Sequence, residues 1–367
     1  MRIEVDCDRI KRNTEAIVRM CSAHGIEIAG VTKGCCGDPD VGRAMLAGGA
    51  SMLAESRLRN VRRLRDAGIT AGIMLLRLPR LSEVDEVVSL TEVSLNSEVD
   101  TVRALSAAAV ARGVTHQVIL MIEAGDRREG VLPADAPDVA AEIAGLPGIE
   151  LIGIGGNMSC IGGVKATKEN TQLLVDVAER IERALGVRFR VISGGHTGSL
   201  WLVAGREIPR RVNQLRVGEG ILLGTDNSTW YPLPSPCKDA FTVVAEVIEL
   251  KTKPSLPEGP PAAGDALGRQ SQWIDAGPRR RAILAMGEQD LRVEALRPKR
   301  PGVTMVGAST DHTVVDVTDA EPPVALGDEL EFNPLWAALA TAMASQDVVK
   351  VVKGWDGGRP ARREGVW

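Results

Sequence analysis

The stretch EIAGVTKGCCGDPDVGRAML, residues 27–46, joins an apolar run to a lysine, a turn and then a helical pattern. The run over residues 28–31 is continuous rather than alternating, which is typical of a parallel strand buried on both faces. Lys33 stands where this strand ends, and small residues, two cysteines and a proline separate it from the helix. The stretch therefore predicts one βα unit with a lysine at the carboxyl end of its strand.

The same rhythm continues outward from this unit to about residue 225. Seven more apolar runs follow, over residues 50–56, 72–78, 92–98, 117–125, 149–157, 189–195 and 212–218. Amphipathic segments lie between them, and those at 98–113 and 167–186 end in glycine, as capped helices often do. Eight consecutive βα units predict a closed (β/α)₈ TIM-type barrel. The alternative, an open doubly wound sheet, lacks a dinucleotide-binding fingerprint after the first strand.

Beyond Gly224 the pattern changes. Residues 227–239 are rich in proline and serine, as a linker would be. The β-rich runs that follow lie at 241–250, 280–287, 303–309 and 312–317, before a short helix and a final strand. We therefore predict an α/β chain with a barrel over residues 7–228 and a smaller, mostly-β C-terminal domain over 229–367. The alternating strand at residues 2–6 is expected to join the second domain.

Composition excludes several classes of protein. The 367 residues are enough for two domains, and 44% hydrophobic with 25% charged residues is ordinary for a soluble globular chain. A net charge of -4 gives no support for nucleic-acid binding, and no apolar run is long enough to span a bilayer. The N-terminus lacks the features of a signal peptide, and the six cysteines form no CxxC pair. We expect reduced thiols and a cytoplasmic protein that binds neither nucleic acid nor membrane.

Catalytic groups of a barrel lie at the carboxyl ends of its strands, where Lys33 is found. An ammonium is costly to bury, so a desolvated lysine has a lowered pKa and becomes a usable base or nucleophile. Schiff-base formation with an aldehyde is the natural chemistry of such an amine. The alternative is a lysine that reaches solvent, or forms an ion pair, at the rim of the barrel.

Two glycine-rich loops follow the last two predicted strands, SGGHTGS at 193–199 and RVGEG at 216–220. In barrels these loops commonly build a phosphate site, since glycines let backbone N–H groups approach an anion. The hydroxyls of Thr197 and Ser199 would add donors. The alternative is an ordinary pair of glycine-rich turns. A reactive lysine together with a phosphate cradle indicates pyridoxal 5′-phosphate (PLP) as cofactor.

Further motifs carry a resemblance to a known family. They include GVTKGCCGDP, SLNSE, GDRREG, GIELIGIGGNMSCIGG, ISGGHTGSL, LRVGEGILLG and VGASTDHTVVDV, at 30–39, 94–98, 125–130, 148–163, 192–200, 215–224 and 306–317. In their order and spacing the chain resembles the alanine-racemase-type (fold type III) PLP enzymes, most closely the ornithine racemase-like branch. The resemblance implies a PLP-dependent amino-acid racemase or epimerase and a homodimer with shared active sites. It also implies ornithine or a related cationic amino acid as substrate. Asp126 and Glu129 are candidates for binding the cationic side chain of such a substrate.

The resemblance also implies roles for single residues. Lys33 would form the imine with the cofactor and act as one of two proton-transfer bases. Arg216 matches the arginine that faces the pyridine nitrogen, and an arginine cannot give up its proton to that nitrogen. The remaining cofactor-binding matches are Arg128 near the phenolic oxygen, Asn157 at the position of a ring-stacking histidine, His196 where the branch usually has asparagine, and Thr197, Gly218 and Glu219 at the phosphate.

One part of the family pattern is missing. The second base of alanine racemases is a tyrosine from the partner subunit, whereas the matching position here is Glu288 and the single tyrosine, Tyr231, lies in the linker. The candidates for a different second base are Cys160, Asp311, His312 and Glu288. Asp311 and His312 follow a strand where the partner approaches in the family, and a carboxylate with an imidazole suffices for proton transfer. The alternative for this pair is a surface turn with an Asx hydrogen bond.

Other functions remain open on the sequence. A fold type III decarboxylase or lyase would share Lys33 and the phosphate cradle without the second base. A non-catalytic PLP-binding protein of the single-barrel type is disfavoured by the C-terminal domain, and a cofactor-free Schiff-base aldolase would not absorb like a PLP protein. Cysteines 35, 36 and 160 with His196 have no metal-ligand spacing, so no metal is expected.

Overall fold

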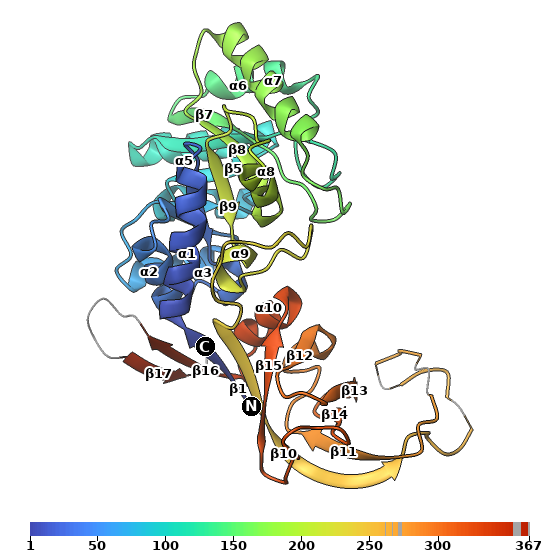
Figure 1. The fold of residues 1–367 in the computed structure, drawn as a ribbon. Helices are drawn as coiled ribbons and strands as arrows, with labels where there is room; N and C mark the ends of the chain where they lie inside the picture. Colours follow the sequence, from blue (N-terminus) through green and yellow to red (C-terminus); the bar gives the residue numbers. More distant parts are fainter. Residues whose placement is uncertain (261, 266, 271–273, 355–360, 366–367) are drawn as a thin grey trace. The chain divides into compact units, whose positions relative to one another are not determined.

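A computed structural model of the chain describes all residues except 261, 266, 271–273, 355–360, 366 and 367. The chain forms two compact units, Asp8–Lys238 and a second unit of Met1–Cys7 with Asp239–Trp367 (Figure 1). Within the part of the chain that the structure describes, no helix is long and apolar enough to cross a membrane.

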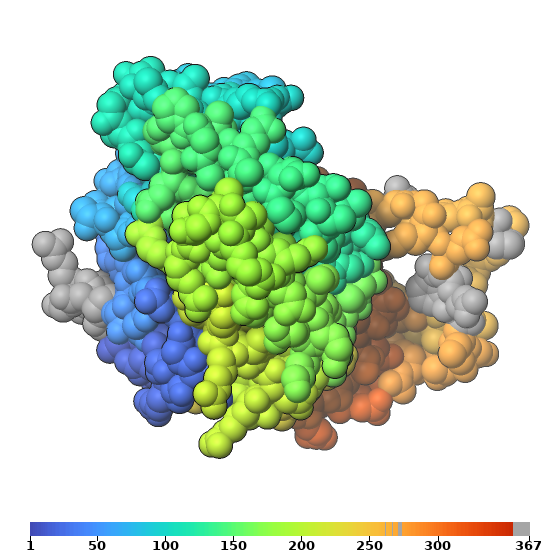
Figure 2. Space-filling view, turned by 90° about the horizontal axis from the view of Figure 1, so that it is seen from above, coloured from blue at the N-terminus to red at the C-terminus, as the bar shows by residue number. Residues whose placement is uncertain are grey.

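The first unit is a closed barrel of parallel strands, as predicted. Its strands follow the chain order, β2 (Glu27–Val31), β3 (Met52–Glu55), β4 (Ile73–Leu75), β5 (Val93–Asn96), β6 (His116–Met121), β7 (Ile149–Gly155), β8 (Val191–His196) and β9 (Gln214–Val217). Pairing of β2 with β9, in which Ala29 lies opposite Arg216, closes the ring. Because consecutive βα units are neighbours, residues close in sequence lie next to one another around the unit's surface (Figure 2).

Helices follow the strands around this unit. They are α1 (Cys7–Ser22), α2 (Pro39–Ala47), α3 (Leu58–Asp66), α4 (Val84–Leu90), α5 (Val99–Arg112), α6 (Ala136–Ala144), α7 (Lys168–Leu185), α8 (Leu200–Ala204) and α9 (Glu219–Leu222). Gly113 and Gly186 end α5 and α7 in the left-handed conformation, which confirms the predicted glycine caps. Apolar strand residues, among them Val31, Met74 and Ile119, pack into a buried cluster that supports the strand ends.

The second unit is a mostly antiparallel sheet. Its strands are β1 (Arg2–Asp6), β10 (Phe241–Pro254), β11 (Pro278–Leu284), β12 (Leu296–Pro298), β13 (Thr304–Ala308), β14 (Thr313–Asp316), β15 (Glu329–Pro334), β16 (Val349–Gly354) and β17 (Ala361–Gly365), with helix α10 (Trp336–Ala344). β1 pairs antiparallel with β10 and parallel with β16, so the N-terminal strand lies in this sheet. The sequence did not indicate β12 or β15, which are short and pair with each other.

The segment 229–238, which we expected at the start of the second domain, belongs to the barrel unit. Its hydrogen bonds explain the difference. Ser235 donates to the carbonyl of Gly220 at 2.8 Å, and the Cys237 amide donates to the side chain of Asn13 at 2.9 Å. The buried Asn13 amide returns a bond to the Cys237 carbonyl, at 2.8 Å. These contacts attach the proline-rich segment to α1 and α9, so the chain leaves the barrel only after Lys238.

Candidate active site

Lys33 is placed by hydrogen bonds on both sides of it. The Thr32 hydroxyl donates to Glu55 at the end of β3, at 2.9 Å. After Lys33 a short 3₁₀ turn, η1 (Lys33–Cys35), leads to Asp38, which caps α2 by accepting from the amides of Asp40 and Val41. Cys35 and Cys36 are both buried in this tight turn, and Cys36 takes a left-handed conformation with φ of 53°. The strand end and the helix start are therefore both fixed, with Lys33 between them.

The environment of Lys33 favours its neutral form. The residue keeps an exposed surface, yet protein around the ammonium removes enough water to lower its pKa. The charges of Arg128 and Arg216 lower this pKa further, whereas Cys160 and Glu55 act in the opposite direction. A neutral amine is the form that attacks an aldehyde or takes up a proton. The lowered pKa agrees with a reactive amine, and the exposed surface of the residue agrees with a lysine at the barrel rim, so both interpretations of Lys33 stay predictions.

Arg216 lies at the end of β9 with a relative exposure of 4%. Its guanidinium donates to the Ser193 hydroxyl of β8 and, at 2.7 Å, to the carbonyl of Gly156 after β7. Burial lowers its pKa to about 10, so the group stays protonated at neutral pH. Arg216 is thus a fixed buried cation that joins three neighbouring strand ends. Sequence reasoning did not identify Ser193 as its partner, although a serine within an apolar strand was a usable signal.

The loop after β8 contains a neutral histidine. His196 Nδ1 accepts from the Gly198 amide at 3.1 Å, and this assigns Nε2 as the donor to the Met158 carbonyl at 2.5 Å. Burial lowers the pKa of His196, in agreement with a neutral ring. The histidine therefore bridges the loops after β7 and β8.

Thr197 and Glu219 lie in the two glycine-rich loops. The amide of Gly220 donates to the Thr197 hydroxyl at 3.2 Å, which brings these loops together. The Glu219 carboxyl accepts from the Asn227 amide and from the Thr225 hydroxyl, each at 3.2 Å. Burial raises the pKa of Glu219 to about 7.

The loop after β6 carries Asp126, Arg128 and Glu129, and the carboxylates of Asp126 and Glu129 are already engaged. Arg128 makes two hydrogen bonds to Glu129, which raise the pKa of Arg128. Asp126 has a relative exposure of 2% and accepts from three backbone amides of residues 160–162. The structure therefore gives neither acid the free carboxylate that we considered for a cationic substrate. Sequence reasoning did not find the contact between Asp126 and residues 160–162.

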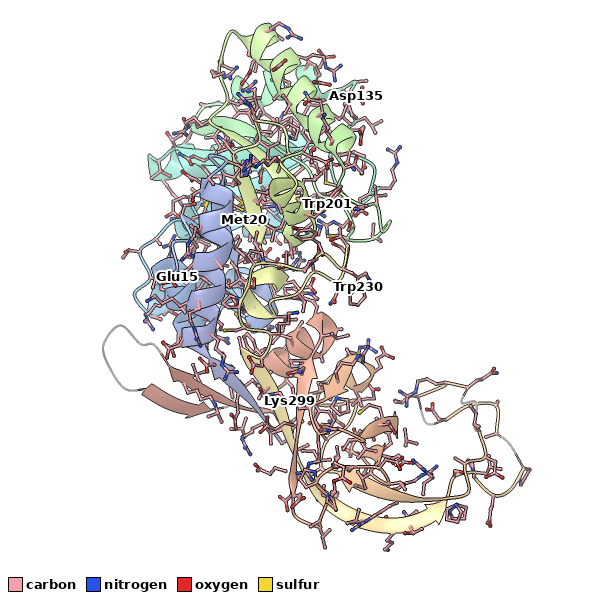
Figure 3. The ribbon with its side chains drawn as sticks, viewed as in Figure 1. Glu15, Met20, Asp135, Trp201, Trp230 and Lys299 are labelled. Carbon is pink, nitrogen blue, oxygen red and sulfur yellow. The ribbon has the colours of Figure 1, made fainter. Side chains whose placement is uncertain are left out.

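Cys160 lies in the loop after β7 and is the exposed cysteine of the chain, the other five being buried. Asn157 donates to its sulfur at 2.8 Å. Charge interactions of Cys160 with Lys33, Arg128 and Arg216 show that these four groups face one region at the barrel mouth. Ala166 lies farther along the same loop. Its carbonyl accepts a hydrogen bond at 3.0 Å from the indole of Trp201, which lies on α8 and is labelled in Figure 3.

The other candidates for a second base lie in the second unit. Asp311 and His312 are exposed on the turn between β13 and β14, where the Ser309 amide donates to the His312 carbonyl at 2.8 Å. Thr310 donates to the Asp311 carboxylate at 2.9 Å. Glu288 is adjacent to this turn through its amide and accepts from Arg269 at 2.9 Å. The structure thus groups Cys160 with Lys33 in one unit and Asp311, His312 and Glu288 in the other.

Comparison with known proteins decides the family. The sequence model of the alanine racemase N-terminal domain matches residues 5–226. The chain belongs to this family. It is 39% identical to the lysine racemase of Thermotoga maritima and 35% identical to the ornithine racemase of Acetoanaerobium sticklandii, over 95% of this chain and 98% of each relative. These matches confirm the predicted family and the predicted class of enzyme, an amino-acid racemase.

Solved structures share the architecture of this family member. The D-threonine aldolase of Filomicrobium marinum aligns with a TM-score of 0.76, covering all of this chain and 94% of that one, at 19% identity. The alanine racemase of Bacillus anthracis aligns with a TM-score of 0.72, covering all of this chain and 97% of that one, at 16% identity. At these identities the likeness concerns the fold alone, and it confirms the predicted barrel with a mostly-β second domain.

Proposed function

We propose that this chain is a PLP-dependent racemase that inverts Cα of a cationic amino acid of the lysine and ornithine type. One observation carries the proposal: an amine of lowered pKa, Lys33, shares a barrel mouth with the buried Arg216. The substrate class rests on the names of the two relatives that match nearly the whole chain. We further propose a homodimer whose subunits share their active sites.

The donor set at the barrel mouth supports PLP. Lys33 offers an amine to an aldehyde, and the Thr197 hydroxyl lies within reach of the loop after β9 as a phosphate donor. Gly198, between these loops, has no room for a side chain, since an added Cβ would lie 2.4 Å from the Ser228 hydroxyl oxygen, and its amide donates to His196 Nδ1. Gly218 and Glu219 are proposed to add backbone amides to this phosphate site.

Bound PLP supplies the electron sink that makes the α-proton of an amino acid removable. The residues of the chain supply the rest. Lys33 would hold the cofactor through its aldehyde and would move a proton on its own side of the substrate. Arg216 stays protonated, so it would face the ring nitrogen as a hydrogen-bond donor and would not deliver a proton to it. Arg128, Asn157 and the neutral His196 are proposed to border the cofactor ring.

Inversion needs a second acid–base group on the opposite side of the substrate. Within the barrel unit this candidate is Cys160, and within the second unit the candidates are Asp311 and His312, which a second copy of the chain would contribute. Carboxylates near Lys33 are engaged, because Glu55 accepts from Thr32 and the Ser56 amide while Asp126 and Glu129 have the partners described above. Recognition of a cationic side chain is therefore assigned to groups outside this cluster.

A substrate screen tests the proposal. The PLP-loaded chain is incubated with single L-amino acids in D₂O, and the products are separated by chiral chromatography. We expect α-deuterated D-lysine or D-ornithine, at a rate well above that for alanine. Release of CO₂ without inversion would replace the racemase by a fold type III decarboxylase. Absence of a PLP absorbance band after loading would contradict both.

A further inference from the structure

We propose that Cys160 is the second acid–base residue of the reaction and that Asp126 is the positioning residue that holds it there. This inference rests on the proposed function, because it concerns the same site. It places both proton-transfer groups, Lys33 and Cys160, on one chain. The family's tyrosine from the partner subunit, which this sequence lacks, is then not required.

The first support is the location of the thiol. Cys160 is exposed at the barrel mouth, and its sulfur accepts a hydrogen bond from Asn157 at 2.8 Å. It interacts with the charges of Lys33, Arg128 and Arg216, so it faces the same region as the amine. Asn157 and Cys160 thus follow β7 as a fixed pair next to Lys33.

The second support is the way the loop is built around Asp126. One carboxylate oxygen accepts from the amides of Cys160 and Ile161, at 3.0 and 3.1 Å, and the other accepts from the amide of Gly162 at 3.0 Å. A row of backbone amides around an anion is a strong local anchor, because charge-assisted hydrogen bonds exceed neutral ones in strength. The buried carboxylate thereby fixes the backbone of Cys160 itself.

Gly162 makes this arrangement possible. A Cβ at this position would lie 2.9 Å from the Asp126 carbonyl oxygen and 3.3 Å from its carboxylate. Ser159 turns the chain with a φ of 58°, and its hydroxyl donates to the Val164 carbonyl at 2.7 Å. The loop is wound tightly around one buried charge that the proposed reaction does not otherwise use.

The proton count of the step balances. In one direction the Lys33 amine takes the α-proton and becomes an ammonium, while the Cys160 thiol gives its proton to the opposite side and becomes a thiolate. In the other direction the thiolate takes the proton and the ammonium returns one. Between turnovers, proton exchange with water restores the starting pair. No oxidant or further reactant is needed.

Cys160→Ala and Cys160→Ser test the catalytic role in the PLP-loaded full chain. We expect both variants to keep the cofactor absorbance and the melting temperature of the wild type, because Cys160 is exposed. Racemisation should fall about 100-fold or more in both directions, the usual contribution of a positioned acid–base group. In D₂O the variants should still exchange the α-proton of one enantiomer, with retention, through Lys33. Wild-type rates of inversion in either variant would overturn the assignment.

Asp126→Asn tests the positioning role, with Asp135→Asn as the matched control. Asp135 is exposed, precedes α6 and makes no capping hydrogen bond (Figure 3). In the cofactor-free chain, hydrogen exchange of the amides of residues 160–162 should become faster in Asp126→Asn and stay unchanged in the control. In the loaded enzyme, kcat should fall about tenfold while KM stays within about twofold. In D₂O, the rate of α-proton exchange should again fall more for one enantiomer of the substrate than for the other.

A double variant separates this inference from a general structural effect. If Asp126 acts through Cys160, then Asp126→Asn with Cys160→Ala should be no slower than Cys160→Ala alone. Additive losses would show that Asp126 acts elsewhere, and unchanged exchange at residues 160–162 would contradict the anchor. A wild-type chain that binds no PLP would instead contradict the proposed function, so the two failures are distinguishable.

Discussion

Two bends of this chain carry candidate proton donors, and they differ in what holds them. The loop after β7 is anchored from outside itself, because the buried Asp126 lies 34 residues earlier in the sequence than Cys160. The turn at 309–312 is held by bonds within itself and by the amides of Glu288 and Gln289, which donate to the carbonyls of Ser309 and Thr310. Among the described residues, however, none outside the turn is seen to bond to the backbone amides of its acid and imidazole, and both side chains are exposed. A proton-transfer residue must be positioned before the reaction begins. The comparison therefore favours the barrel loop as the site of proton transfer.

Lys33→Ala should give the largest effect of all, because it removes the amine proposed to bind the cofactor and to move a proton. We expect loss of racemisation by about 10⁴-fold or more. Borohydride should no longer fix the cofactor covalently to the chain, which absorbance and mass spectrometry of the treated protein will show. A variant that still carries a borohydride-reducible cofactor would show that Lys33 does not bind it. Proton transfer in the loop after β7, rather than in the turn at 309–312, would then lose its support.

Arg216→Met should lower the stability of the chain, because Arg216 also contributes to the folding of the barrel unit. The substitution leaves the buried Ser193 hydroxyl and the Gly156 carbonyl without their partner, which we expect to cost about 2–3 kcal/mol of unfolding free energy. Urea unfolding of the cofactor-free chain measures this. Arg279→Met is the contrast. Arg279 lies in the second unit, is partly exposed and pairs with Asp316 there. If Arg279→Met lowers the unfolding free energy as much as Arg216→Met, then the buried arginine of the barrel unit contributes no more to stability than the partly exposed one of the second unit.

Glu219→Gln should make stability depend on pH in a defined direction. The folded-state pKa of about 7 lies above the ordinary value of 4.5 for a glutamate, so the unfolded chain releases this proton at lower pH. The penalty is absent below pH 4.5, grows as pH rises and is complete above about pH 7. We expect the variant to match the wild type at low pH and to be more stable by about 1–2 kcal/mol at pH 8.

The measurement for Glu219 is urea unfolding of the cofactor-free chain across this pH range. Glu15→Gln on α1 is a suitable control, since Glu15 lies on an exposed face and pairs only loosely with Lys11 (Figure 3). An equal pH dependence in both variants would show that the loop after β9 has no special environment.

Asp311→Asn and His312→Ala should have the smallest effects. If the turn only borders a site, each change should lower racemisation by less than about tenfold, or less than about 1.4 kcal/mol in activation free energy. Initial rates in both directions by chiral chromatography measure this. A loss that equals that of Cys160→Ala, and falls on one enantiomer, would transfer the second base to the turn and support a site shared between subunits.

Much of the fold could be predicted because its signals are local. Most barrel strands were visible as continuous apolar runs, since a parallel strand buried on both faces needs apolar residues throughout. The strand-end positions of Lys33 and Arg216 followed from the same pattern. β15, with the sequence ELEFNP, was not found, because its alternating burial is carried by few residues. The end of the barrel unit was placed too early, because Ser235 and Cys237 bond to residues far away in sequence.

The sequence by itself determined the order of the βα units, the lysine at the first strand end and the absence of the family's tyrosine. Only the tertiary structure decided that Asp126 holds the backbone of Cys160 and that Arg216 bonds to the Ser193 hydroxyl. The physical reason is the range of the interactions. Strands and helices follow from periodic burial over a few residues, whereas these contacts join separate loops that meet only when the barrel closes.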